Sequence, residues 1–238
     1  MENYNIEDFR KIIKTLRSPD GCPWDRVQTH ESMRTCLIEE CYEVLEAIDN
    51  KDDDNLKEEL GDVLLQVVMH SRIAEERGAF TFDDVVQGIS EKMIRRHPHV
   101  FGNENGELTV PGAVDWDKIK QEEKRNTSQA DVGPLTAIPK SLPALLRAQK
   151  VLKKSDKLYG DGITALESVG NIQRSLEELK EFILINGENG LENKYDSDNI
   201  GAIILEIVNI ARELQENAEN SLTNMVETFI NKRESNKE

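Results

Sequence analysis

Acidic side chains are concentrated in residues 36–70, beside runs of Leu, Ile and Val. The carboxylates are Glu39, Glu40, Glu43, Glu58, Glu59 and Asp62. A carboxylate held away from water without a partner is costly or takes up a proton, so a group of them facing a core needs a cation. Carboxylate ligands without Cys or a fixed His are the preference of hard cations. The segment therefore predicts a site for Mg²⁺ or Mn²⁺, with Ca²⁺ less favoured.

Helical periodicity predicts which elements carry these acids. In a helix over 31–49, three acids form a stripe at the border of the apolar face: Glu39, Glu40 and Glu43. In a helix over 53–77, apolar residues cover nearly the whole circumference and leave one polar strip: Glu59, Asp62, Gln66 and His70. A helix that is apolar almost all round is expected to be central and buried. Antiparallel packing of the two helices would bring four or five carboxylates to one site.

The alternative is that the acids form a solvated face, which is more plausible for the first helix than for Glu59 and Asp62. Glu46, Glu58 and the acidic run 52–54 are expected to be ordinary surface charge.

A cluster of cations follows the acids. Lys92 and Arg96 lie four residues apart with Arg95 beside them, and Trp116 and Lys120 have the same spacing. Cations, an aromatic ring and metal-bound carboxylates together indicate a nucleoside triphosphate site. The metal would bridge phosphate oxygens, the cations would neutralise the rest, and Trp116 could stack on a base. The alternatives are a charge cluster that complements a helix C-terminus and a core aromatic residue.

Composition excludes several classes of function. The formal net charge of -16 argues against non-specific binding to nucleic acid or to an anionic membrane. The three cysteines form no CxxC pair, and we find neither a signal peptide nor a membrane span, so a cytoplasmic protein is expected. Phosphate-binding loops, GxSxG and HExxH are absent from the sequence, which leaves covalent catalysis by Ser or Cys without support.

Apolar spacing of three and four residues dominates the chain and predicts an all-α fold with almost no sheet. The expected helices are 6–17, 31–49, 53–77, 82–96, 115–125, 141–155, 165–186, 198–218 and 220–234. Three prolines in residues 126–143 indicate an interdomain linker. The predicted organisation is a catalytic domain over 1–125, this linker, and a smaller domain over 144–238.

The two halves resemble each other. Residues 37–48 (LIEECYEVLEAI) have a counterpart at 175–185 (SLEELKEFILI), and 60–72 have one at 200–212. In this register Asn199 and Ala202 replace Glu59 and Asp62. We therefore expect two helical bundle units, one working and one degenerate.

Four motifs together resemble the MazG family of nucleoside triphosphate pyrophosphohydrolases. They are EExxE at 39–43, ExxD at 59–62, GCPWD at 21–25 and RRHPHVFG at 95–102. The likeness extends through 137–150 and, more weakly, over the second repeat. It implies an all-helical bundle that commonly forms a homodimer. It also implies Mg²⁺-dependent hydrolysis between the α and β phosphates, which gives a nucleoside monophosphate and pyrophosphate.

The resemblance also assigns roles to residues. Glu40, Glu43, Glu59 and Asp62 match the family's metal ligands, and Glu39 would lie outside them or orient the attacking water. The positions that would hold the nucleotide are Lys92, Arg96, Trp116 and Lys120, with Arg95 beside them. Two alternatives remain open: a narrower hydrolase acting on dUTP or a damaged nucleotide, and a non-catalytic helical scaffold with an acidic binding groove.

Overall fold

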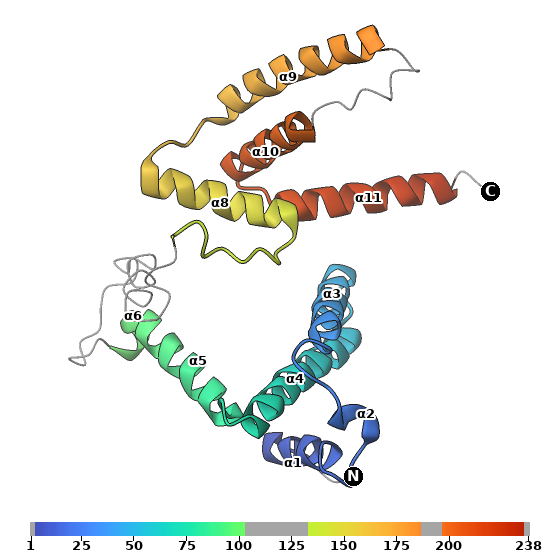
Figure 1. Cartoon of the computed structure of the whole chain (residues 1–238), viewed down its shortest axis with the longest axis vertical. Helices are drawn as coiled ribbons and strands as arrows, with labels where there is room; N and C mark the ends of the chain where they lie inside the picture. The colour runs from blue at the N-terminus through green and yellow to red at the C-terminus, as the bar shows by residue number, and fades with distance from the viewer. Residues whose placement is uncertain (1–2, 103–132, 187–196, 236–238) are drawn as a thin grey trace. The chain divides into compact units, whose positions relative to one another are not determined.

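A computed structural model describes residues 3–102, 133–186 and 197–235 (Figure 1). All regular secondary structure within these ranges is helical, which confirms the predicted all-α class. The chain divides into two compact units, residues 1–119 and 120–238. The helix expected at 115–125 and the first part of the expected linker, 126–132, lie outside the described residues, so the predicted domain limits stay predictions. None of the described helices is both long and apolar enough to cross a bilayer.

The first unit contains six helices within the described residues. They are α1 (Ile6–Leu16), α2 (Pro23–Arg26), α3 (Arg34–Asn50), α4 (Asp53–Glu76), α5 (Phe82–Arg96) and α6 (Pro98–Phe101). Side-chain caps begin three of these helices: Asn5 caps α1, Asp52 caps α4 and Thr81 caps α5, whereas α3 begins without one. Lys51 adopts a left-handed conformation (φ 55°) and ends α3, so the chain reverses directly into α4.

Helix α4 is the centre of this unit. It packs against α3 along its length and also contacts α1 and α5. The buried core is Ile13, Met33, Val68, Met69 and Ile73, so it surrounds the C-terminal half of α4. The acids lie on the N-terminal half.

The prediction that α4 is buried all round is therefore wrong for its first half, where Leu60 and Leu64 are 51% and 40% exposed. The apolar face of α3 is also only partly covered, because Ala47 is buried while Ile38, Leu45 and Ile48 are about half exposed. The described part of the chain supplies too few neighbouring helices to cover these positions.

The second unit contains α8 (Ala144–Tyr159), α9 (Ala165–Asn186), α10 (Ser197–Glu213) and α11 (Ala218–Glu234). Helix α9 packs along α10, α8 packs on α10, and α11 contacts both α8 and α10. This order of contacts resembles that of α1, α3, α4 and α5, and it is compatible with the predicted repeat. The proposed degeneracy of the second unit stays a prediction.

Several predicted helix limits are wrong by a few residues. Helix α3 begins at Arg34 rather than at 31, because residues 29–33 form turns. Helix α10 ends at Glu213 rather than at 218, because Gln215 has a positive φ of 62° and Asn217 already caps α11. The short helices α2 and α6, each begun by a proline, were not expected from the periodicity.

Candidate active site

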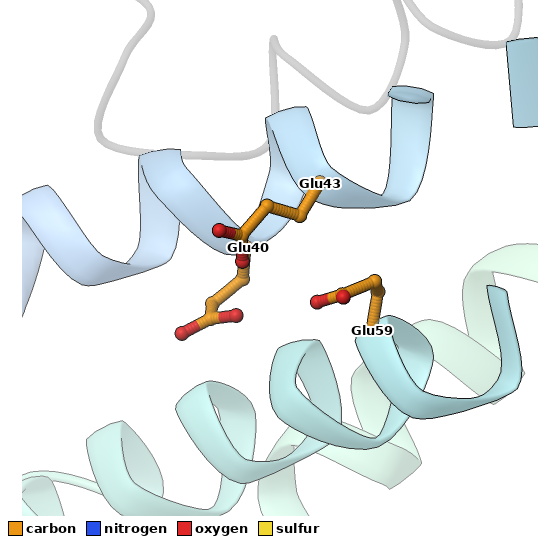
Figure 2. A group of neighbouring side chains, drawn as sticks. All are labelled: Glu40, Glu43 and Glu59. Atoms are coloured by element: carbon orange, nitrogen blue, oxygen red, sulfur yellow. The ribbon is translucent and has the colours of Figure 1, made fainter. Parts of the chain in front are cut away.

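Three carboxylates converge between α3 and α4. Figure 2 shows Glu40 and Glu43 descending from α3 toward Glu59, which rises from α4. One oxygen of each side chain lies within 4.8 Å of the others. Glu40 and Glu59 are partly buried, while Glu43 is exposed. The antiparallel packing expected from the sequence thus brings acids from the two helices together.

Negative charge is crowded at this group. Partial burial raises the pKa of Glu40 above its ordinary value, and the nearby Asp62, Glu43 and Glu59 raise it further. The pKa of Glu59 is also raised, first by partial burial and then by Glu43, Asp62 and Glu58. Such a group holds protons more tightly than isolated carboxylates do, and a divalent cation would relieve the same repulsion.

The donor set fits a hard divalent cation. All three groups are carboxylates, and Mg²⁺ and Mn²⁺ prefer oxygen ligands. Oxygens about 2.1 Å from one Mg²⁺ ion can lie at most about 4.2 Å apart, so small side-chain rotations would bring the three groups onto one ion.

The two other predicted acids occupy different positions. Asp62 lies one turn beyond Glu59 on α4 and acts electrostatically on both Glu40 and Glu59, although it is not one of the three converging groups. Glu39 is exposed on α3 and also lies outside the group. Their assigned roles stay predictions.

The predicted cations lie at the far end of α5. Figure 1 shows α5 leaving the C-terminal end of α4 and diverging from the α3–α4 pair. The described residues of one chain therefore do not bring Lys92, Arg95 and Arg96 to the three carboxylates. Trp116 and Lys120 lie outside the described residues.

Comparison with known proteins decides the family. The chain is 41% identical over 225 residues to the nucleoside triphosphate pyrophosphohydrolase/pyrophosphatase MazG of Thermotoga maritima, covering 94% of this chain and 82% of that protein. This chain belongs to the MazG family. The profile of the MazG nucleotide pyrophosphohydrolase domain matches residues 28–101, which include all three converging acids. The nucleoside triphosphate pyrophosphohydrolase of Escherichia coli K12 is 38% identical over 225 residues, covering 94% of this chain and 84% of that protein. The uncharacterised protein YabN of Bacillus subtilis is 53% identical over 150 residues, which are 63% of this chain and 30% of YabN.

In this MazG chain, a buried arginine fixes the GCPWD segment to α4. The Arg17 guanidinium donates to the carbonyl oxygens of Asp25 and Gln28 at 2.6 and 3.1 Å. It also donates to both carboxylate oxygens of Glu76, at 3.2 and 2.8 Å. The pKa of Glu76 is lowered, chiefly by this contact with Arg17. Sequence analysis did not find this connection, because it joins residues 59 positions apart and neither belongs to a motif.

The glycine of the same motif is required by packing. A Cβ atom at Gly21 would lie 2.3 Å from the carbonyl oxygens of Thr15 and Leu16, both part of the backbone. Cys22 then donates its N–H to the Leu16 oxygen at 2.8 Å. The motif thus folds tightly against the end of α1 and leads the chain toward α3.

Proposed function

We propose that this chain hydrolyses nucleoside triphosphates between the α and β phosphates, releasing a nucleoside monophosphate and pyrophosphate. The observation that carries the proposal is the convergence of Glu40, Glu43 and Glu59 from two packed helices. The named activities of the relatives from Thermotoga maritima and Escherichia coli support it. Mg²⁺ is the proposed cofactor, with Mn²⁺ as a substitute, held by these three residues and Asp62.

The chemistry needs no covalent intermediate. A bound divalent ion would supply a Lewis acid for the phosphate and lower the pKa of a water molecule. The carboxylates would hold the ion, and in its absence their negative charge would repel a triphosphate. The proposed role of Glu39, which is exposed on α3 outside the converging group, is to orient the attacking water.

Positive groups complete the proposed site. Because the described residues of one chain do not bring Lys92, Arg95 and Arg96 to its own three carboxylates, we propose that the second copy of a homodimer supplies them to bind phosphate oxygens and to stabilise charge on the departing pyrophosphate. Trp116 stacks on the base, and Lys120 contributes a further charge to the nucleotide. The proposed role in the cell is control or cleansing of the cytoplasmic nucleotide pool.

A homodimer is part of the proposal. Both acid-bearing helices leave large apolar side chains exposed: Ile38, Tyr42, Leu45 and Ile48 on α3, and Leu60 and Leu64 on α4. Several large exposed apolar side chains on two packed helices favour a protein interface there. A second copy would cover these side chains and shield the carboxylates from water, which would strengthen their attraction for a metal.

The deciding experiment measures pyrophosphate release from a panel of canonical and modified nucleoside triphosphates, with and without Mg²⁺. Wild type is compared with Asp62→Ala and with Glu178→Ala, an exposed residue at the equivalent of Glu40 in the second unit. Metal-dependent release that is lost only in Asp62→Ala supports the proposal, and the panel ranks general against dUTP-specific or damaged-nucleotide activity. Absence of release from every nucleotide would favour a non-catalytic binding scaffold.

A further inference from the structure

Two histidines outside the proposed metal site meet through their Nδ1 atoms. The Nδ1 atoms of His30 and His70 are 2.9 Å apart, their ring planes differ by 13°, and the ring centroids are 5.1 Å apart. The centroids are farther apart than the nitrogens by nearly the width of a ring. The rings therefore meet edge to edge in almost one plane, and the nitrogens point at each other. This is the geometry of an N–H···N hydrogen bond.

Such a bond exists in only some protonation states. With both rings neutral, one Nδ1–H donates and the other Nδ1 accepts; with one proton added, the bond becomes charge-assisted. With both rings protonated, two N–H groups oppose each other and two positive charges meet, so the contact cannot persist. The pKa of His70 is lowered from its ordinary 6.5, first by burial and then by the charge of His30. The folded pair thus resists the second proton.

The pair closes the open end of the α3–α4 hairpin. His30 lies in the segment between α2 and α3, four residues before α3 begins, and His70 lies in the C-terminal half of α4. At the other end of the hairpin, the turn at Lys51 and Asp52 joins the two helices covalently. The converging carboxylates lie between these two connections, so their alignment depends on both.

The second unit makes the same connection without a titratable group. The side-chain nitrogen of Asn209 on α10 donates to Ser168 Oγ on α9 at 2.9 Å, and both residues are buried. In the register that pairs Glu39 with Glu177, Ser168 falls opposite His30, whereas Asn209 falls opposite Met69, one residue before His70, in the register that pairs 60–72 with 200–212. The histidine pair thus belongs to the unit that carries the full set of acids.

Other charged groups lie on the elements that carry the pair or pack against α4. They are Glu31 beside His30, Arg17 on α1, Arg34 on α3, Arg72, Glu76 and Arg77 at the end of α4, and Asp83 on α5. Arg17 and Arg72 both bond to Glu76, and Asp83 bonds to Arg10. Glu31 interacts electrostatically with His30 and with Arg77. Its single charge can favour one imidazolium ion but cannot remove the opposition of two N–H groups.

We propose that His30 and His70 are positioning residues that hold the α3 acids in line with the α4 acids, and that protonation of both rings on acidification releases this connection. The consequence for turnover rests on the proposed function, whereas the release itself does not. Arg17 still binds the segment before α3 through the carbonyl of Gln28, so the unit stays folded when the pair separates.

A first experiment tests the bond directly. In protein labelled with ¹⁵N-histidine, a scalar coupling between the Nδ1 nuclei of His30 and His70 is expected at about pH 7.5 and is lost at about pH 5.5. His97 and His99 serve as internal references. Absence of the coupling at the higher pH, or its persistence with both rings protonated, would overturn the proposal.

A second experiment uses two variants of His30. The amide of His30→Asn can occupy the Nδ1 position and either donate or accept, so it keeps the bond at every pH; His30→Phe keeps a ring but removes the bond. Between about pH 7.5 and 5.5, the melting temperature of wild type should fall by several degrees more than that of His30→Asn. The melting temperature of His30→Phe should be low at both pH values. The wild-type kcat should fall about fivefold more than that of His30→Asn, with less change in KM.

The two readouts separate the hypotheses. Parallel pH profiles of melting temperature in wild type and His30→Asn would refute the positioning role. Different melting profiles without any pyrophosphate release would retain the histidine connection and refute the proposed activity instead.

Discussion

Replacing Glu43 by Gln should sharply weaken divalent metal binding while leaving the fold intact. Glu43 belongs to the three converging carboxylates and contributes to the raised pKa values of both Glu40 and Glu59. Gln has nearly the same size but carries no charge, and the Glu43 side chain is exposed, so packing should not change. The substitution therefore isolates the electrostatic contribution of one carboxylate.

The expected magnitude follows from Coulomb's law for an exposed group. Two unit charges about 4 Å apart attract by about 1 kcal/mol in bulk water, so one carboxylate and a divalent ion attract by about 2 kcal/mol. At about 1.4 kcal/mol per tenfold change in affinity, its loss weakens metal binding by about 30-fold. Direct coordination brings the charges closer than 4 Å, so about 30-fold is a lower bound.

The assay is isothermal titration of Mn²⁺ or Mg²⁺ into wild type, Glu43→Gln and Glu39→Gln. Glu39→Gln is the matched control, because it removes one charge from the same helix outside the converging group. Screening by solvent should limit its effect on affinity to about fivefold. If Glu39 orients the attacking water, Glu39→Gln should instead lower kcat with metal affinity largely retained.

Equal metal affinity in wild type and Glu43→Gln would refute the reasoning, as would equal losses in the two variants. The first result would mean that the ion does not bind between α3 and α4. The second would mean that it responds only to the net charge of α3.

Three further predictions follow from the same unit. Arg17→Met should lower the free energy of unfolding by about 2 kcal/mol in urea denaturation, because it leaves the carbonyl oxygens of Asp25 and Gln28 without this donor and leaves the partly exposed Glu76 with Arg72 alone; a loss below about 1 kcal/mol would contradict this. Gly21→Ala should destabilise by at least about 2 kcal/mol, because its Cβ would meet backbone oxygens, whereas Gly88→Ala has open space and should stabilise by about 0.5–1 kcal/mol. The pKa values of Glu40 and Glu59 are raised above 4.5 in the folded, metal-free protein. The stabilisation that these two groups contribute when protonated is therefore fully present below pH 4.5 and is lost as the pH rises through the raised pKa values. Apparent Mg²⁺ affinity should change in the opposite sense and begin to fall on acidification well before pH 4.5; affinity that is constant down to pH 4.5 would be inconsistent with the raised pKa values.

Local sequence patterns predicted much of the fold. Apolar spacing located nearly all of the long helices, because helical periodicity is a local property of each segment. The predicted start of α3 was three residues too early, because residues 29–33 form turns, and their one apolar side chain, Met33, gives no periodicity from which the boundary could be read. The short helices α2 and α6 lack a full period of the pattern, so periodicity could not reveal them.

The candidate site was predicted in part. Spacing placed Glu40, Glu43 and Glu59 on facing stripes, and the structure brings them together. Their degree of burial was not predictable, because it depends on which other helices cover α3 and α4. The cations at 92–96 were assigned to the same site by their chemistry, yet α5 diverges from α4 (Figure 1). Only the packing angle between two helices decides such a separation.

The sequence by itself determined the helices, the acids on them and the family, because each is written in local spacing or in motifs. The tertiary structure decided the connections that hold these parts in place. His30 meets His70 across 40 residues, and Arg17 meets Glu76 across 59. Neither contact leaves a periodic trace in the chain, since each depends on the path of the backbone between two helices. The depth to which the carboxylates are buried, and hence the direction of their pKa shifts, has the same origin.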